Sequence, residues 1–193
     1  PSCAGRNMGP KQGAADPRSL PEVTVSLLEK AGYQVIFPDM LSQLCCGMPF
    51  QSKGQFAAAK SKLTELEQQL LIATDNGSIP VYSDTSPCSL TMQGKLDSRL
   101  KIYDSIDFLN DYVLPHLTVT PKTEPIALHI TCSASRMGQG SKLRQLANAC
   151  SKQVIVPEQI SCCGFAGDKG LLLPELNAAA LSTLKNQVSG CSQ

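Results

Sequence analysis

The sequence predicts an α/β fold made of two pseudo-symmetric, Rossmann-like modules with mostly parallel sheets, related by internal duplication. Two observations lead to this prediction. Short apolar segments with the character of strands alternate with longer segments whose apolar residues recur at helical spacing. The same cysteine motif also occurs once in each half of the chain. Strands separated by helices pair in parallel through right-handed crossovers, so each half is expected to hold a parallel sheet.

Three blocks of sequence recur in the same order in the two halves. A lone Cys is followed five positions later by Met-Gly, an apolar segment then ends in Pro and an acidic residue, and a Cys-Cys-Gly triplet comes last. The first copies span residues 3–9, 35–39 and 45–47, and the second copies span residues 132–138, 154–158 and 162–164. Three matching blocks in one order predict a duplication.

The first half is predicted as helix, strand, helix and strand. Ser19 and Glu22 form a capping box that opens the first helix, and Gly32 is placed to end it. The following elements are strands over residues 33–37 and 79–83, with a leucine-rich helix over residues 55–74 and an Asp-Asn-Gly turn between them. In this order of elements, the first Cys-Cys-Gly triplet lies in the loop between the strand over residues 33–37 and the helix over residues 55–74.

The second half repeats this plan. Its predicted elements are strands over residues 126–130 and 153–156 and helices over residues 141–150 and 174–188. We expect a first module over residues 1–103, a connecting helix and loop over residues 104–125 with the helix ending near residue 117, and a second module over residues 126–193. A strand precedes Cys132, but its counterpart would lie before Pro1, so we expect a fragment of a polypeptide that continues on both sides.

The amino-acid composition excludes several classes of function. The net charge is +1 without a basic run, and no apolar run approaches the roughly 20 residues of a membrane span, so neither nucleic-acid binding nor a transmembrane segment is expected. The chain has nine cysteines, an odd number, and four of them form the adjacent pairs Cys45-Cys46 and Cys162-Cys163. Adjacent cysteines are too close for an unstrained disulfide. Metal or redox chemistry in a reducing, cytoplasmic setting is therefore favoured over structural disulfides.

Each half offers a lone Cys at a strand end, an adjacent pair before a Gly that permits positive φ, and a further Cys. Four thiolates at one point suit zinc or an iron-sulfur cluster, and cysteine pairs in zinc sites are usually separated by about two to four residues, which favours iron and sulfide here. The candidate ligands are Cys3, Cys45, Cys46 and Cys88 in the first half and Cys132, Cys162 and Cys163 in the second, with Cys191 as the fourth candidate there.

Other potential ligands receive a structural interpretation. Cys150 closes an amphipathic helix and is interpreted as a small packing residue. His116 is expected at the surface, and His129 is expected in the core, although its distance of three residues from Cys132 keeps a zinc ligand open. No residue is predicted to be catalytic.

The duplicated motif resembles the cysteine-rich CCG domain found in heterodisulfide reductase, in the glycolate oxidase iron-sulfur subunit, and in the C-terminal region of FAD-linked D-lactate and related D-2-hydroxyacid dehydrogenases. Residues 162–170, with Leu-Pro-Glu-Leu at 173–176, are most similar to the dehydrogenase branch, and residues 86–88 and 129–133 fit as well. The resemblance implies an iron-sulfur electron-transfer region that passes electrons from reduced flavin to a quinone or other acceptor.

The resemblance also implies the cofactors and the setting. A 4Fe-4S or noncubane iron-sulfur cluster is expected in the parent protein, with FAD and a ferredoxin-like domain upstream, and the parent protein is expected in the cytoplasm or at the inner face of the membrane. Thr85 stands where the reductase has the first Cys of a Cys-x-x-Cys, which disfavours a five-thiol cluster in the first half. We expect the chain to be isolated without an intact cluster. Two alternatives stay open: a non-catalytic module with zinc or free thiols, and thiol/disulfide chemistry of the heterodisulfide reductase kind.

Overall fold

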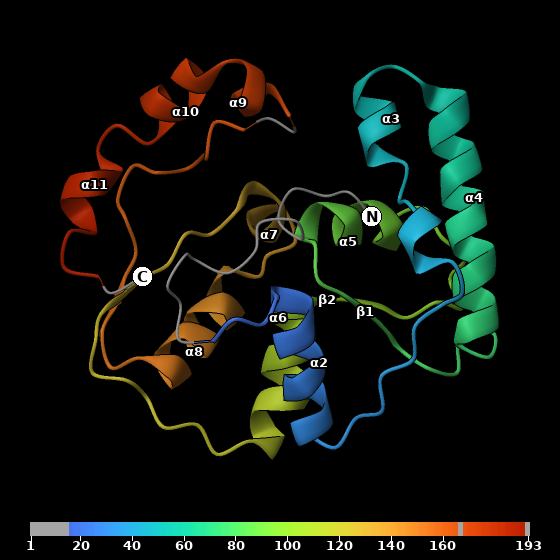
Figure 1. Cartoon of the computed structure of the whole chain (residues 1–193), viewed down its shortest axis with the longest axis horizontal. Helices are drawn as coiled ribbons and strands as arrows, with labels where there is room; N and C mark the ends of the chain where they lie inside the picture. The colour runs from blue at the N-terminus through green and yellow to red at the C-terminus, as the bar shows by residue number, and fades with distance from the viewer. Residues whose placement is uncertain (1–15, 166–167, 192–193) are drawn as a thin grey trace. The chain divides into compact units, whose positions relative to one another are not determined.

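The computed structural model describes residues 16–165 and 168–191. Its chain divides into two compact units, with the division after Phe108 (Figure 1). Helices alternate with short strands, and the strands form two small sheets, each of two parallel strands. The predicted α/β class with parallel sheets is therefore confirmed, and the two sheets fall one in each unit.

The sheet of the first unit consists of β1 (Val81–Ser83) and β2 (Ile102–Asp104), with Ser83 opposite Asp104. Helix α5 (Ser86–Gln93) lies between these strands in the sequence and contacts both of them. The strand predicted over residues 79–83 is confirmed, although it is shorter. Because the strands are parallel, their carboxyl ends share one edge, and α5 begins there.

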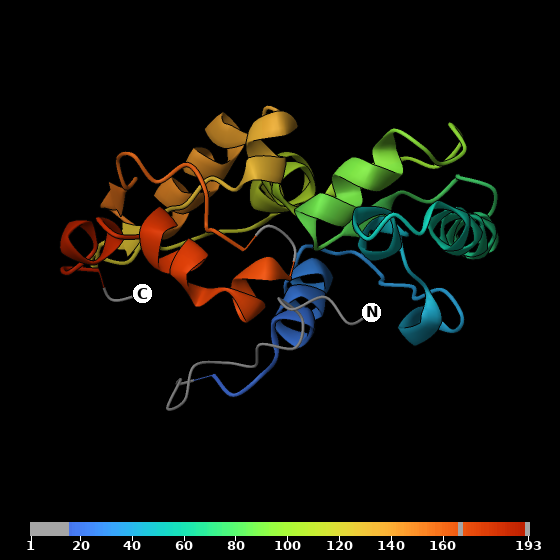
Figure 2. The same cartoon turned by 90° about the horizontal axis from the view of Figure 1, so that it is seen from above.

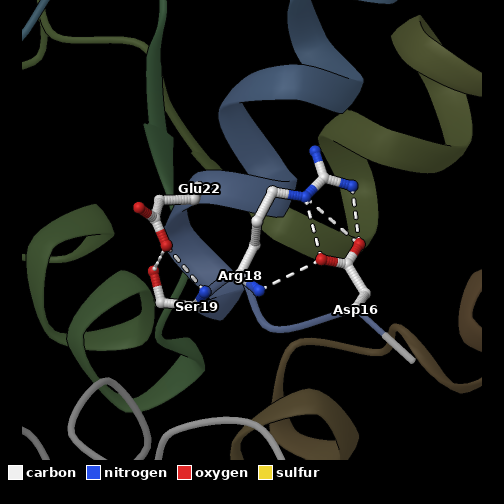
Figure 3. Close-up of polar contacts among 4 residues, drawn as sticks. All are labelled: Asp16, Arg18, Ser19 and Glu22. Atoms are coloured by element: carbon white, nitrogen blue, oxygen red, sulfur yellow. Dashed lines mark hydrogen bonds and ion pairs between the residues drawn. The ribbon is translucent and has the colours of Figure 1, made fainter. Parts of the chain in front are cut away.

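Helix α2 (Leu20–Lys30) opens on the predicted capping box (Figure 3). The backbone N–H and the hydroxyl of Ser19 both donate to Glu22 Oε2, each at 2.7 Å. Just before it, the Arg18 guanidinium donates to the Asp16 carboxylate, which lowers the pKa of Asp16 to about 2. The bond from the Ser19 N–H satisfies a backbone donor that has no partner within the helix.

The predicted strand over residues 33–37 is wrong for the described part of the chain. Gly32 ends α2 with a φ of +91°, as expected, and residues 33–37 pair with no strand among the described residues. The second unit shows what is missing, because β4 (Val154–Ile155) exists by pairing with β3 (Ile126–Ala127). Apolar extended residues become a strand only where a neighbouring strand supplies the ladder.

The core of the first unit lies beside the long helix α4 (Phe56–Ala73), which confirms the helix predicted over residues 55–74 (Figure 1). Short helix α3 (Met48–Ser52) packs against α4. The buried cluster is apolar and includes one thiol; its members are Leu44, Cys46, Leu66, Leu70, Met92 and Leu100. The loop with the first cysteine pair is therefore part of the core of this unit.

The turn after α4 forms as predicted, with positive φ at Asp75, Asn76 and Gly77. A second packing centre of this unit surrounds Phe108 in α6 (Ser105–Phe108). Its ring lies 5.3, 5.6 and 5.9 Å, between centroids, from three tyrosine rings, which are those of Tyr33, Tyr82 and Tyr103. Burial among these groups raises the pKa of Tyr82 to about 12.

The single connecting helix predicted over residues 104–117 is wrong. Asp104 ends β2, and its buried side chain accepts the Ile106 N–H at 3.1 Å, which fixes the start of a new turn. The chain then changes helix type twice before Pro115. Pro115 has no backbone N–H to donate, so it cannot make the hydrogen bond of a continuing α-helix. Its parts are α6, the π-helical η2 (Leu109–Val113) and the 3-10 helix η3 (Leu114–His116).

The sheet of the second unit pairs β3 with β4 in parallel, and Lys122 and Ser151 form an isolated bridge. Both strands lie inside the predicted ranges and are only two residues long. Two helices lie between the strands in the sequence, α7 (Cys132–Arg136) and α8 (Gly140–Cys150). Helix α8 confirms the prediction, whereas α7 was not expected.

The C-terminal helix predicted over residues 174–188 is interrupted. It forms as α10 (Pro174–Ala180) and α11 (Leu184–Gln187), with α9 (Lys169–Leu172) before them (Figure 2). Thr183 stands at the break, and its hydroxyl accepts from the Gln187 side chain at 3.2 Å. That amide also exchanges two hydrogen bonds with the backbone of Glu158. Side-chain bonds of this kind compete with a continuous helix.

The interpretation of Cys150 as a packing residue is wrong. It ends α8 as predicted, but its side chain is exposed. The buried position of this helix is Ala147.

Among the helices of the described residues, none is both long enough and apolar enough to cross a membrane.

Candidate functional site

The cysteines of the first unit meet where two helices begin. Cys45 and Cys46 precede α3, whose N-cap is Gly47, and Cys88 lies in the first turn of α5. Pro49 and Pro87 occupy the first turns of these helices, where a missing N–H costs nothing. Because α3 and α5 contact each other, thiols that are 42 residues apart in the sequence come together.

The sulfur atoms of Cys46 and Cys88 are 3.1 Å apart. Cys46 is 5% exposed, and burial alone would raise the pKa of its thiol. The hydrogen bond with Cys88 outweighs this effect, and backbone N–H groups, including that of Met48, act in the same direction. The pKa of Cys46 is lowered to about 6. The hydrogen bond with Cys88 and the backbone amides thus favour the ionised form of this buried thiol.

Cys45 is the third thiol of this group. Its Sγ accepts the Gly47 N–H at 3.4 Å, and its own side chain also contributes to lowering the pKa of Cys46. Cys45 and Cys88 are half-buried, so the group lies between core and surface. Cys3, the fourth predicted member, lies outside the described residues.

The second unit repeats the loop with more exposure. Cys162 Sγ accepts the Gly164 N–H at 3.3 Å, and Cys132 Sγ lies 3.8 Å from the carbonyl oxygen of Ser161. Cys132, Cys162 and Cys163 are all exposed. The structure thus brings Cys132 next to the loop with the second pair. Cys191, the remaining candidate, is half-buried after α11.

The glycine of each triplet is required by its surroundings. Gly47 and Gly164 have φ of +80° and +76°, which confirms the expected positive φ. A Cβ at Gly47 would collide with the backbone carbonyl of Ala59 in α4. A Cβ at Gly164 would lie 2.5 Å from Leu176 O and 2.8 Å from Asn177 N in α10. Each cysteine loop is therefore held directly against the backbone of the second helix after it, α4 in the first unit and α10 in the second.

The two histidines do not join these thiols in the structure. His116 is exposed at the end of η3, as predicted. His129 is half-buried just after β3. Within residues 16–165 and 168–191, no three side chains of His, Cys, Asp or Glu form a group that could hold a metal ion.

The donor chemistry of the first unit fits an iron-sulfur cluster. This unit brings the sulfur atoms of Cys46 and Cys88 to 3.1 Å, has Cys45 directly before Cys46 in the sequence, lowers the pKa of Cys46 and directs backbone amides at sulfur. The spacing of Cys46 and Cys88 is tighter than ligation requires. Two thiolates on one tetrahedral ion at about 2.3 Å would be about 3.8 Å apart, so the 3.1 Å pair would have to open slightly.

Sequence reasoning missed α5, although a signal for it was present. Ser86-Pro87 after Thr85 is typical of a helix start, because Pro is favoured in the first turn. It also missed a cavity beside Cys46 that includes Lys60 and Lys95. The two lysines are 35 residues apart, so no local pattern could have joined them.

The comparisons with known proteins agree with this architecture. A family model described as CCG, the cysteine-rich domain, matches residues 1–93 and 126–186. The chain belongs to the CCG cysteine-rich domain family. The match falls in two segments, one over each Cys-Cys-Gly triplet, so the CCG domain is duplicated as the internal repeat predicted.

Two curated relatives carry names that concern lactate. Lactate utilization protein A of Oceanobacillus iheyensis is 26% identical, over 86% of this chain and 72% of the relative. Lactate utilization protein A 1 of Bacillus mycoides is 25% identical, over 81% of this chain and 70% of the relative. No solved structure matches the chain.

Proposed function

We propose that this CCG protein is the iron-sulfur electron-transfer region of a FAD-dependent D-2-hydroxyacid dehydrogenase of the D-lactate type. The proposal places FAD on an upstream flavin domain and a quinone-type acceptor downstream in the electron path, with the protein in the cytoplasm or at the inner face of the membrane. The observation that carries it is the 3.1 Å approach of the Cys46 and Cys88 sulfur atoms at the starts of two helices, with Cys45 directly before Cys46. The family match and the lactate-related names of the relatives support it.

Two sets of ligands follow from the duplication. Cys3, Cys45, Cys46 and Cys88 would hold a cluster in the first module, over residues 1–103. Cys132, Cys162 and Cys163, with Cys191 as the fourth, would form the equivalent set in the second module, over residues 126–193, with residues 104–125 as the connection. When bound, an iron-sulfur cluster supplies a carrier of single electrons.

The residues of the first unit prepare this site in three ways. The lowered pKa of Cys46 means that this ligand needs no deprotonation at neutral pH. The Gly47 amide, and that of Met48, offer hydrogen bonds to sulfur, and such bonds tune the reduction potential of a cluster. Leu66 and Leu70 belong to the same buried cluster as Cys46, which is 5% exposed, so the Cys46 sulfur is largely shielded from water.

Anaerobic reconstitution with ferrous iron and sulfide tests the proposal. The chain should become brown, hold about four iron and four sulfide per occupied module, and give an EPR signal after reduction. Colourless protein without iron would contradict the proposal. Stoichiometric zinc that remains bound under the same conditions would favour a structural zinc module instead.

The 3.1 Å sulfur separation favours a second candidate, a dithiol/disulfide pair of Cys46 and Cys88. Oxidation would form one S–S bond and pass two electrons and two protons to a disulfide substrate, which becomes two thiols. Replacement of Cys45 by Ser separates the candidates. Iron binding should be impaired if Cys45 is a ligand, whereas a Cys46–Cys88 dithiol would still reduce an added disulfide.

A further inference from the structure

A cavity of about 230 Å³ opens beside Cys46 in the first unit. It lies between the start of α3, one face of α4 and the chain after α5, and its wall includes Cys46, Gln51, Phe56, Lys60, Leu63 and Lys95. Pockets for drug-sized ligands have volumes of about 300–1,000 Å³, so this cavity suits a smaller molecule. The proposed function uses Cys46 and Gly47 of this wall and none of its other residues.

Two cations face this cavity without a carboxylate partner in the described residues. Lys95 Nζ donates to the neutral Gln51 Oε1 at 2.7 Å, and Lys60 makes no ion pair within the same part of the chain. Lys62, two positions along α4, behaves differently and pairs with Glu65 at 2.7 Å. Lys60 and Lys95 are both exposed, so their ammonium groups are accessible to an anion that enters the cavity.

The remainder of the wall is apolar. Phe56 is 68% exposed, although a phenyl ring normally gains from burial, and Leu63 is half-buried beside it. A ligand that covers Phe56 would remove apolar surface from water, and a planar group would also stack on the ring. The cavity combines two ammonium groups with an aromatic face.

The second module has no charge at the position equivalent to Lys60. Counted from the glycine of each triplet, Asn177 corresponds to Lys60 and Leu173 corresponds to Phe56. The Asn177 amide is used locally, since it donates to the carbonyl of Cys163 at 2.8 Å. Lysine and phenylalanine at the first-module positions are thus not a requirement of the loop fold.

We propose that this cavity binds a small organic carboxylate. Its carboxylate group would lie between Lys60 and Lys95, and its apolar body would cover Phe56 and Leu63. Because Cys46 and Gly47 form part of the wall, an occupant would also cover the buried thiol. The proposal stands whether or not the thiols hold a cluster.

The test uses the reduced full chain and benzoate, which combines a carboxylate with an aromatic ring. Benzoate should shift the amide NMR signals of Gly47 and Lys60, with a Kd of about 1 to 10 mM, as expected for so few atoms. Benzyl alcohol keeps the ring without the charge and should bind at least about tenfold more weakly. Benzoate should also slow the alkylation of Cys46 by iodoacetamide and leave that of the exposed Cys150 unchanged.

The decisive variant is Lys60→Gln combined with Lys95→Gln, which should weaken benzoate binding about tenfold or more. Lys101→Gln removes one charge from the same unit outside the cavity wall and should bind benzoate like the unaltered chain. Binding that is the same in all three proteins, or equal binding of benzyl alcohol, would overturn the proposal. Iron uptake by the double variant reports separately on the proposed function, which predicts no change.

Discussion

The two Cys-Cys-Gly loops share a local geometry and differ in burial. In each, the glycine amide donates to the sulfur of the first cysteine, at 3.4 Å in the first unit and 3.3 Å in the second. The second cysteine differs, because Cys46 is 5% exposed in an apolar core whereas Cys163 is exposed. Local sequence therefore determines the loop, and the packing of later helices determines the environment of the thiols.

The helices after the loops account for this difference. Helix α4 has 18 residues and buries Leu66 and Leu70 next to the first pair. In the second unit α9 and α10 have 4 and 7 residues, and Leu171 and Leu172 are 63% and 73% exposed. A long amphipathic helix gives the first thiols a low-dielectric setting in which each hydrogen bond to sulfur has more effect.

The largest expected effect concerns the ionisation of Cys46. Cys88→Ala removes the main cause of the lowered pKa, so the pKa of Cys46 should rise from about 6 toward its ordinary value of 9.0. A rise of about two units reduces the ionisation constant about a hundredfold. Ultraviolet titration of the thiolate measures this, with Cys150→Ala in the second unit as the control, and an unchanged titration would show that Cys88 does not stabilise the thiolate.

Ionisation of the Cys46 thiol should also make the free energy of unfolding depend on pH. Between about pH 6 and 9 the unfolded chain binds the proton that folded Cys46 has lost, so the free energy of unfolding should rise with pH in this window. The contribution is lost as pH falls through about 6. Urea unfolding across this range should show a smaller slope for Cys88→Ala than for the unaltered chain.

The next effect tests why both loops contain glycine. Gly47→Ala should lower the free energy of unfolding by about 3 kcal/mol, because the new Cβ meets the Ala59 carbonyl and φ is positive. Gly54→Ala has a similar φ of +77° with open space around it, and should cost only about 1 kcal/mol. Denaturant unfolding compares them, and equal losses would mean that the close contact with α4 contributes nothing.

A smaller effect isolates the second loop. Asn177→Ala removes the hydrogen bond to the Cys163 carbonyl and should destabilise the second unit by about 1 kcal/mol. Lys60→Ala, at the equivalent position of the first unit, breaks no hydrogen bond or ion pair within the described residues and should change stability by less than about 0.5 kcal/mol. Hydrogen exchange of each loop would reveal this contrast, and equal effects would contradict it.

The smallest effect concerns the ion pair between Asp111 and Lys142, which joins η2 to α8 at 2.6 Å. Both side chains are more than one-third exposed, so Lys142→Gln should cost about 0.5 kcal/mol or less. The loss should shrink further at high salt. A larger, salt-independent loss would indicate that Lys142 acts by packing.

Predictions from local signals succeeded. The capping box of Ser19, the positive φ of Gly47 and the turn after α4 depend on neighbouring residues, and each forms as expected. The internal repeat predicted the positions of both cysteine loops from their local sequence motifs. The two strands predicted for the second unit also form, and they pair in parallel.

Predictions that depended on distant partners failed. Residues 33–37 lack a neighbouring strand in the described chain, and Asp104, predicted to begin a helix, is the last residue of β2. Cys150 has the spacing of a core residue but no covering element. The sequence grouped Cys46 with Cys88 as candidate ligands, but their 3.1 Å separation depends on the packing of α3 against α5, which residue spacing does not specify.

The most direct test of the central claim is the iron content of matched cysteine variants after anaerobic reconstitution. Cys46→Ser and Cys163→Ser should each reduce the bound iron and sulfide, whereas Cys150→Ser should retain the full content. Cys46→Ser should also abolish the EPR signal of the cluster proposed for the first module, while Cys163→Ser should leave that signal in place. Equal iron in all four proteins, or no iron in any of them, would contradict the assignment of the Cys-Cys-Gly loops as cluster ligands.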